Sequence, residues 1–264
     1  MVDYVNKKII MKIERFVGIV VLLLALQYSR AQETHVIEPS VVEVGYQVKY
    51  EKMVDYYALR IGKNICQYFS YEKYRSDSLG SNPETSMIFL NELLEAANKK
   101  NDKSKQEKGS PGHGNYIYRW LNKDSCVTYT SRNGSGYRIA ETAPKQEWTI
   151  YEDSTKNVLG FNCHMAKTHF RGRDWTVWFS EDIPMLLGPW KLGGLPGLIL
   201  EVQNTGFIEI KAVSVDTKNP KPVTFYNFWN KKFEDIDRKT YIRKACNPQN
   251  YPKGTKMTPE MECE

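Results

Sequence analysis

Apolar and polar residues alternate with a period of two along most of this sequence. In the stretch YQVKYEK, Tyr46, Val48 and Tyr50 share one face, while Gln47 and Lys49 share the other. The same period recurs in NYIYRWL, CVTYT, GYRIA, EWTIY, FNCHMAKTHF, DWTVWFS, LILEVQ and GFIEIKAVSV, which short polar turns separate. Because successive side chains of a strand point to opposite faces, this pattern predicts half-buried strands in an antiparallel meander. LILEVQ and FIEIKAV, separated by NTG, predict a β-hairpin.

One segment, residues 83–99, has helical spacing instead, with apolar side chains three or four positions apart at Met87, Leu90, Leu94 and Ala97. Asn82 can cap this segment, and Pro83 suits a first helical turn. We therefore expect one amphipathic helix that packs on the sheet. The charged, glycine-containing residues 98–114 are expected to form a flexible loop. The predicted fold class is α+β, dominated by a curved antiparallel sheet.

The first 31 residues have the features of a signal peptide. A basic stretch precedes the apolar run VGIVVLLLAL, and Ser29 and Ala31 occupy the −3 and −1 positions of a small-x-small cleavage site before Gln32. The run is shorter than the ~20 apolar residues that a membrane span needs. We expect export and cleavage, with translation from Met11 as an alternative start and a retained membrane anchor as the alternative outcome.

The expected organisation is a signal peptide (1–31), a β-rich domain (32–227) and an irregular basic tail (228–264). Removing the signal peptide takes five basic and two acidic side chains from totals of 37 and 31, which leaves a net charge of +3. This balance gives no support to a nucleic-acid partner. After cleavage, no transmembrane segment is expected.

All five cysteines lie beyond the predicted signal peptide, where an oxidising compartment favours disulfides. The candidates for pairing are Cys66, Cys126, Cys163, Cys246 and Cys263. Five is an odd number, so at least one thiol is left over, and the pairing of the others stays open. No CxxC pair occurs, which argues against a thioredoxin-type redox site or a zinc knuckle.

The stretch from residue 156 to 202 closely resembles the signature region of the GLPGLI family, exported proteins of Gram-negative bacteria. Residues 194–199 read GLPGLI, and the supporting matches are Gly160, Cys163, Gly172-Arg173, Trp175, Trp178, Ile183-Pro184 and Gly188-Pro189-Trp190. The resemblance implies a periplasmic or cell-surface protein without an established activity. The order of cysteine strand, aromatic strand and glycine-proline turn is also similar to the half-barrel sheet of lipoprotein carriers, an architectural likeness that implies no function.

The turn within GPWKLGGLPGLILEV can be either a rigid sheet corner or the lip of a binding cleft. Pro196 and Gly197 suit the second and third positions of a type II turn, where the third residue takes a positive φ. Gly193 and Gly194 would let the backbone pass close to Trp190. The residues of the turn that we take as ligand-binding candidates are Trp190, Gly194, Leu195, Pro196 and Gly197.

Further candidates lie on the strands before this turn. Trp175 and Trp178 have opposite parity on one strand, so Trp178 faces either the helix or a concave apolar cavity. Arg171 and Arg173 would join Lys167 and His169 in a basic stripe able to hold a carboxylate or phosphate, if the strand is continuous. Gly172 would scatter the two arginines if it marks a turn.

Catalytic and metal-binding motifs are missing from the sequence. Cys163 and His164 are adjacent, so their side chains diverge on a strand and cannot act as nucleophile and base. His164 and His169 also point apart, which argues against a two-histidine metal site. No HExxH, GxSxG, paired-carboxylate or EF-hand pattern occurs. We expect no catalytic residue, no metal and no cofactor.

The function expected from the sequence is a non-enzymatic cell-envelope protein that binds a hydrophobic small molecule or a partner segment. One alternative is an interaction module that docks onto an outer-membrane protein assembly. A second is an unrecognised enzyme or metal-handling protein built on the basic stripe and an unpaired thiol.

Overall fold

A computed structural model of the chain describes residues 34–50, 53–99, 107–108, 114–132, 134–250 and 261–262. The predicted signal peptide, most of the predicted loop 98–114 and Cys263 lie outside these residues. Within the described part, no helix is long and apolar enough to cross a membrane.

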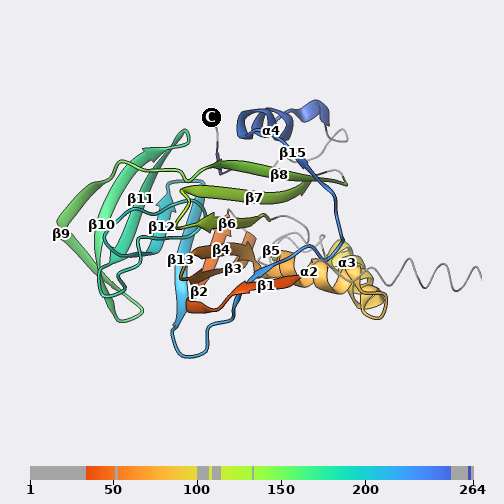
Figure 1. Cartoon of the computed structure of the whole chain (residues 1–264), viewed down its shortest axis with the longest axis horizontal. Helices are drawn as coiled ribbons and strands as arrows, with labels where there is room; N and C mark the ends of the chain where they lie inside the picture. Colours follow the sequence, from red (N-terminus) through yellow and green to blue (C-terminus); the bar gives the residue numbers. More distant parts are fainter. Residues whose placement is uncertain are drawn as a thin grey trace, which may run out of the picture.

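Strands dominate the described chain (Figure 1). They are β1 (His35–Glu38), β2 (Ser40–Tyr50), β3 (Met53–Gly62), β4 (Ile65–Ser70), β5 (Glu107–Lys108), β6 (Tyr116–Trp120), β7 (Ser125–Arg132), β8 (Ser135–Thr142), β9 (Thr149–Val158), β10 (Phe161–Phe170), β11 (Arg173–Ser180), β12 (Leu198–Asn204), β13 (Ile208–Asp216), β14 (Val223–Phe225) and β15 (Phe233–Asp235). The helices are α2 (Tyr71–Ser81), α3 (Ser86–Lys99), α4 (Arg238–Ala245) and the 3₁₀ turn η1 (Pro248–Asn250).

One large sheet runs in the order β15-β8-β7-β6-β4-β3-β2-β13-β12-β11-β10-β9, and β5 adds to β3 outside this path. Neighbouring strands are antiparallel except at β15–β8 and β3–β5, and β1 pairs with β14 in a separate two-stranded sheet. The sheet curves strongly, so that β9–β12 form a wall at one end of the molecule (Figure 1). The predicted β-dominated antiparallel fold and the β12–β13 hairpin are confirmed.

The inner face of the curved sheet carries the main core. Tyr46, Leu59, Trp175 and Phe179 are almost fully buried there. The segment 181–197 fills the space between the two ends of the sheet and contributes Ile183, Leu187, Trp190, Leu192 and Leu195 to the same cluster. The inner face is therefore occupied by the chain itself.

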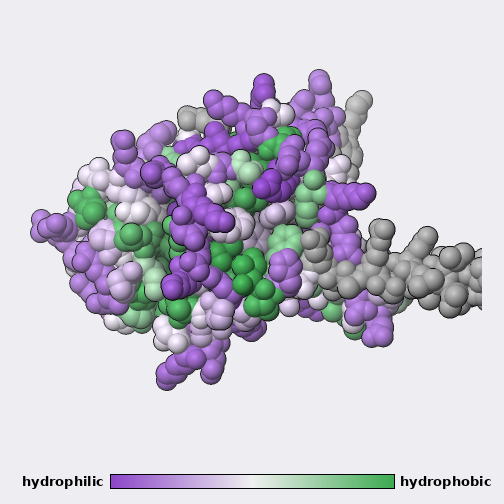
Figure 2. Space-filling view, in the orientation of Figure 1, coloured by the Kyte–Doolittle hydropathy of each residue, from purple (hydrophilic) through white to green (hydrophobic). Residues whose placement is uncertain are grey.

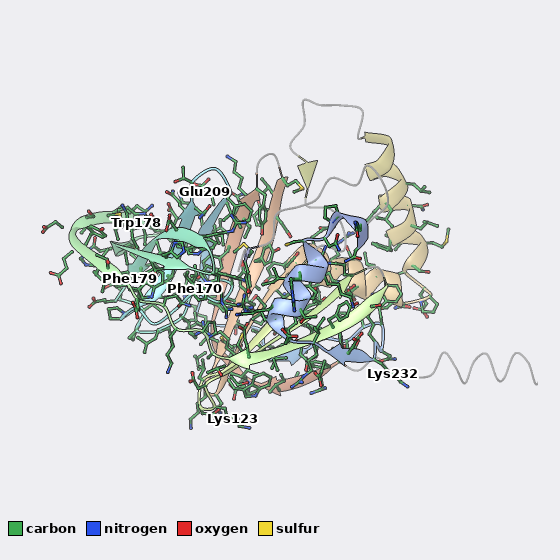
Figure 3. All side chains as sticks on the ribbon, turned by 90° about the horizontal axis from the view of Figure 1, so that it is seen from above. Lys123, Phe170, Trp178, Phe179, Glu209 and Lys232 are labelled. Carbon is green, nitrogen blue, oxygen red and sulfur yellow. The ribbon has the colours of Figure 1, made fainter. Side chains whose placement is uncertain are left out.

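Only part of the outer face of the sheet is covered by other segments of the chain. Over β3, β4 and β6, the rings of Phe69, Tyr116 and Tyr118 pack against Tyr226 and Phe228 of the segment after β14, and α2 closes this second core. Over β9–β13 the outer face carries alternating polar side chains and no helix (Figure 1). Figure 3 shows this division of faces, with Trp178 and Glu209 on one side and Phe179 and Phe170 on the other.

Much of the remaining surface is hydrophilic. In the view of Figure 2, hydrophobic residues gather in small groups, one of them over β1, where Val36 and Ile37 are exposed. Small exposed apolar groups of this kind are usual in folded proteins.

The helix predicted over 83–99 forms as α3 but does not lie on the sheet as expected. It packs mainly on α2, and Gly80 of α2 approaches Phe89 of α3 closely. Met87, Leu90 and Leu94, which the spacing assigned to the buried face, are exposed. The helix that does pack on the sheet is α2, which Ser70 caps by accepting a hydrogen bond from the Lys73 N–H. Because α2 has few apolar residues, the spacing of apolar residues did not predict this helix.

The predicted irregular tail also needs correction. Within the described part of 228–264, β15 pairs in parallel with β8, and α4 follows it. Tyr241 and Ala245 of α4 are buried against Tyr137 and Ile139 of β8. The helix caps itself through Asp237, whose carboxylate accepts the Thr240 N–H at 2.9 Å.

Candidate functional site

A cleft of 540 Å³ opens on the outer face where its covered and uncovered parts meet. It lies between β2, β3, β13 and the first residue of α2. Its lining residues are Glu43, Gly45, Tyr46, Tyr56, Tyr57, Tyr71, Val213, Ser214, Asp216, Asn219 and Lys221. Sites for small ligands in proteins usually have volumes of about 300–1,000 Å³, so this cleft has the size of a ligand site.

A β-bulge shapes the floor of the cleft. Ala212 pairs with Tyr46 and Ser214 with Gly45, so Val213 is an extra residue on β13. A Cβ atom on Gly45 would lie 2.5 Å from Oγ of Ser214, which explains why glycine stands in the middle of this strand. Bulges bend a strand and change the direction of its side chains, here toward the loop that forms the rim of the cleft.

Glu43 fixes one wall. Its Oε1 accepts a hydrogen bond from the Tyr71 hydroxyl at 2.5 Å, and its Oε2 accepts one from the Lys221 N–H at 2.8 Å. Nε of the buried Arg60 lies 3.3 Å from the same carboxylate. Burial and the hydrogen bond to Glu43 raise the pKa of Tyr71, which therefore stays a neutral donor. Glu43 thus ties α2, the rim loop and the sheet together.

The opposite wall presents an aromatic ring to solvent. Tyr56 is 49% exposed, and its hydroxyl accepts a hydrogen bond from Nε2 of Gln47 at 3.0 Å. The hydroxyl hydrogen of Tyr56 is therefore left to donate to a ligand. On the rim, N–H groups of Asn219 and Lys218 bond the carboxylate of Asp216 and lower its pKa, so this acceptor is ionised at neutral pH.

These groups suit a polyhydroxylated ligand. Apolar ring faces can cover the C–H face of a sugar, while carboxylate, amide, ammonium and hydroxyl groups exchange hydrogen bonds with its hydroxyls. Both oxygens of Glu43 are already engaged with protein donors. The arrangement is therefore that of a recognition site with a rigid wall.

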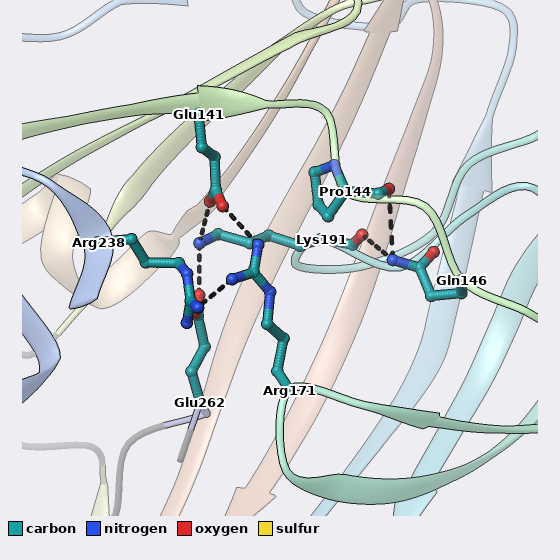
Figure 4. A network of polar contacts seen from close by, with 7 residues as sticks. All are labelled: Glu141, Pro144, Gln146, Arg171, Lys191, Arg238 and Glu262. Atoms are coloured by element: carbon teal, nitrogen blue, oxygen red, sulfur yellow. Dashed lines mark hydrogen bonds and ion pairs between the residues drawn. The ribbon is translucent and has the colours of Figure 1, made fainter. Parts of the chain in front are cut away.

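A separate cluster of charges lies on the inner side (Figure 4). The buried Lys191 ammonium contacts Glu141 at 2.5 Å and also Glu262. Arg171 pairs with Glu141 at 2.5 Å, and Arg238 pairs with Glu262 at 2.9 Å. Burial alone would lower the pKa of Lys191, but the carboxylates of Glu262 and Glu141 raise it. The cluster joins β8, the 181–197 segment, α4 and the end of the described chain.

The structure places the candidates of the 188–197 turn mainly in the core. Trp190 is 5% exposed and packs against Trp175 and Phe170 at ring-centroid distances of 5.5 and 5.7 Å. Leu195 is buried as well, whereas Gly194 and Pro196 face solvent. The cleft contains none of these residues. The turn therefore packs into the core through Trp190 and Leu195, and a binding role for Gly194 and Pro196 stays a prediction.

The positive φ lies at another glycine than expected. Gly194 has φ +84, and Gly197 is instead required for close approach, because its Cβ would lie 2.1 Å from the Ser180 carbonyl oxygen. A Cβ on Gly193 would lie 2.8 Å from the Leu186 carbonyl oxygen, so this glycine lets two backbone segments approach each other. The glycines serve contacts between backbone segments, which sequence spacing cannot reveal.

The basic stripe does not form. Arg171 and Gly172 both take positive φ, so β10 ends at Phe170 and the chain turns before β11. Arg171 joins the charge cluster, while the Arg173 guanidinium lies 3.8 Å from the centroid of the Phe207 ring. Trp178 faces outward from β11, opposite to Trp175, and is partly exposed. The aromatic strand therefore has one core face and one solvent face.

The predicted disulfides are not formed among the described residues. Cys66, Cys126 and Cys163 are buried free thiols, and Cys246 stands at the C-cap of α4. Burial raises the pKa of Cys66 and Cys163 to about 11 and that of Cys126 to about 12. These three thiols are protonated at neutral pH and act as small apolar core residues.

The cleft could not be predicted from the sequence because its residues come from four separate segments. One signal was present: Gly45 interrupts a strand pattern, and an isolated glycine in a strand often marks a bulge or a close approach. The exposed Tyr56 lay in a segment that was not interpreted. Nothing in the spacing of β2 and β13 reveals that they pair.

Comparison with known proteins identifies the family. A family model described as "N-glycanase peptide, N-terminal domain" matches residues 70–243. Two solved structures of PNGF-II align with this chain. The crystal form in space group P21 aligns with a TM-score of 0.50 and 20% identity, over 80% of this chain and 33% of that one. The C2 form aligns with a TM-score of 0.49 and 19% identity, over 76% and 31%. No curated protein matches.

The family match overturns the resemblance to the GLPGLI family and the function inferred from it. N-glycanases are enzymes, so a non-enzymatic envelope protein for a hydrophobic ligand was the wrong expectation, as was a docking module. The matched region also runs past residue 227, the predicted end of the β-rich domain. The chain spans about a third of the length of the PNGF-II chains.

Proposed function

Because this chain belongs to the family of N-glycanase peptide N-terminal domains, we propose that it binds asparagine-linked glycans of glycoproteins, the material on which an N-glycanase acts. The observation that carries the proposal is the cleft between β2, β13 and α2. It joins an exposed tyrosine ring to a rim of hydrogen-bonding groups, within a fold whose family is tied to glycans by its description.

The outer face is the side on which a ligand would enter. Among the described residues, the segment 181–197 packs its apolar side chains into the core of the inner face. The likeness to the half-barrel of lipoprotein carriers stays a proposal about shape alone. Glu43 and Tyr71 hold the cleft wall in place before binding, and such preorganisation reduces the entropic cost of association.

Export is part of the same proposal. The N-terminal sequence supports it with a basic stretch, an apolar run and a small-x-small cleavage site. A glycan-binding protein at the periplasm or the cell surface would meet glycoproteins from outside the cell. Intact-mass measurement of the protein secreted by its producing cells would show whether the chain begins at Gln32.

Binding can be measured with a synthetic glycopeptide that carries an asparagine-linked chitobiose disaccharide. Titration calorimetry on the full chain should give saturable binding, and the same peptide without sugar should give none. Tyr56→Ala removes the exposed ring and should weaken binding by about fivefold, since a stacked aromatic contact contributes about 1 kcal/mol. Leu186→Ala, which truncates an exposed apolar side chain outside the cleft, is the matched control and should bind like the wild type.

Equal signals from the two peptides would refute glycan binding. A Tyr56→Ala protein that folds and binds normally would refute the cleft as the place of binding. Mass spectrometry of the same samples reports whether the bond between glycan and asparagine is cut. Release of the sugar would show that the protein also hydrolyses this bond.

A further inference from the structure

A row of side chains crosses the uncovered outer face and ends at the cleft. Strand register pairs Tyr151 of β9 with Met165, Met165 with Trp178, and Trp178 with Glu201. It continues from Glu201 to Lys211, from Lys211 to Gln47 and from Gln47 to Tyr56. We call these residues the outer row: Tyr151, Met165, Trp178, Glu201, Lys211, Gln47 and Tyr56. Side chains paired directly across antiparallel strands share one face, so all seven lie on the same side of the sheet.

Aromatic rings stand at both ends and near the middle of the outer row. Tyr151 is 39% exposed, Trp178 is partly exposed, and Tyr56 is also a wall of the cleft. Adjacent strands are about 4.8 Å apart, so Tyr151 and Trp178 are separated by about 10 Å along the sheet and Trp178 and Tyr56 by about 19 Å. The outer row is therefore about 29 Å long.

Charged and polar groups accompany the rings. Nζ of Lys156 lies 4.4 Å from the centroid of the Trp178 ring and 2.5 Å from the carboxylate of Glu201. Nζ of Lys167 lies 5.4 Å from the centroid of the Tyr151 ring. At Trp178 and Tyr151, a ligand would meet a lysine ammonium that lies over the ring and can donate hydrogen bonds.

The neighbouring row, one pleat further along the strands, is polar from β9 to β2. Its members pair in the order Thr149, Lys167, Thr176, Gln203, Glu209 and Lys49. A protein partner would need an apolar centre to its interface, which the two rows together do not offer. Separate rings within a polar surface match instead a chain of sugar units, whose apolar faces alternate with hydroxyl groups.

We infer that the outer row binds the outer branches of an extended oligosaccharide whose asparagine-linked end lies in the cleft. The inference rests on the proposed function and deepens it: the preferred substrate is a long glycan, and Trp178 is a specificity residue for length. The disaccharide next to the asparagine would contact only the cleft, and the longer branches would run along the sheet toward Tyr151.

The test compares two glycopeptides of the same peptide sequence, one with chitobiose and one with a branched high-mannose glycan. The wild-type chain should bind the long glycan about tenfold more tightly. Trp178→Ala should remove most of this gain and leave the affinity for the chitobiose peptide unchanged. Tyr151→Ala, at the far end of the outer row, should lose a smaller part of it. Leu186→Ala is again the control.

The outcomes separate the two proposals. Equal affinity of the wild type for both glycopeptides, with no change in Trp178→Ala, would overturn the binding role of the outer row. Glycan binding in the cleft would remain. Failure of both glycopeptides to bind would overturn the proposed function and the outer row together. If Trp178→Ala does not fold, Tyr151→Ala and saturation-transfer NMR on the wild type decide, since sugar protons beyond the disaccharide must receive signal.

Discussion

At the scale of single residues, Asp55 is a carboxyl group in surroundings that disfavour its charge. It lies on β3, where its carboxylate accepts hydrogen bonds from Oγ of Ser70 at 2.8 Å and from the Tyr56 N–H at 2.6 Å. Burial outweighs these two bonds, and the nearby Glu72 adds repulsion, so the pKa of Asp55 rises to about 6 from an ordinary value of 3.8. The folded protein therefore favours the neutral acid.

The stability of the protein should depend on pH through Asp55. Because the folded pKa lies above the unfolded one, its contribution is fully present below pH 3.8 and is lost as the pH rises through about 6. Asp55→Asn should thus be more stable than the wild type by about 2–3 kcal/mol at pH 8, with the difference vanishing at pH 4. Urea unfolding of both proteins at pH 4, 6 and 8 measures this difference.

Asp216→Asn provides a control of opposite sign, because its backbone partners lower the pKa of Asp216. That variant should lose a small amount of stability at pH 8 and none at low pH. A difference between Asp55→Asn and the wild type that is the same at every pH would show that Asp55 is not the titrating group.

At the scale of elements, the segment 181–197 shows that a turn can be a part of the core. Its backbone bonds to itself and to β12: the Gly194 N–H bonds the Leu186 carbonyl at 2.9 Å, and the Ile199 N–H bonds the Leu187 carbonyl at 3.0 Å. Its glycines allow backbone segments to touch. Trp148 strengthens the arrangement by donating its Nε1–H to the Gly193 carbonyl at 2.8 Å.

The two kinds of glycine in this segment should respond differently to alanine. Gly197→Ala places a Cβ against the Ser180 carbonyl oxygen and should cost about 2–4 kcal/mol of unfolding free energy. Gly194→Ala meets no atom within 4 Å but must hold φ +84, which costs about 1–2 kcal/mol. Urea unfolding of both variants shows which one loses more unfolding free energy. A larger loss for Gly194→Ala would contradict the close-approach role of Gly197.

The two neighbouring helices, α2 and α3, show that apolar spacing does not decide which helix packs on the sheet. The strongly amphipathic α3 leaves Leu94 55% exposed, whereas the polar α2 buries Lys73, Ser76 and Asp77. Asp77 satisfies this burial by pairing with Lys73 at 2.6 Å and accepting hydrogen bonds from Tyr116 and Trp229. Polar side chains with complete partners can be buried, so apolar spacing alone misassigned which helix covers the sheet.

At the scale of the whole molecule, the charge cluster around Lys191 links regions far apart in the sequence. Glu141, Arg171, Arg238 and Glu262 come from β8, the β10–β11 turn, α4 and the end of the described chain. Burial alone would raise the pKa of Glu262, but the charge of Lys191 and the hydrogen bonds from Lys191 and Arg238 lower it. The cluster thus holds ionised groups in the interior.

Removing Lys191 should loosen these connections. Lys191→Met keeps the bulk of the side chain but leaves Glu141 and Glu262 without their shared ammonium, a loss of about 3–5 kcal/mol. Thermal unfolding and limited proteolysis of the region around α4 measure it. The control is Arg75→Met, which breaks the exposed Arg75–Glu92 pair and should cost at most about 1 kcal/mol. Equal effects of the two changes would refute a structural role for the cluster.

The sequence alone determined β2 and β6 to β13, most of their faces, the β12–β13 hairpin and the span of α3, whereas β3 and β4 were not predicted. These follow from the period of neighbouring side chains and from turn residues, which act over a few positions. The tertiary structure decided which strands pair, which glycine contacts which backbone, which helix covers the sheet and where the cleft opens. Gly45 meets Ser214, and Tyr151 is aligned with Tyr56 across seven strands, only because the sheet curves and brings distant segments into register. Burial and pairing depend on these long-range contacts, which no local period encodes.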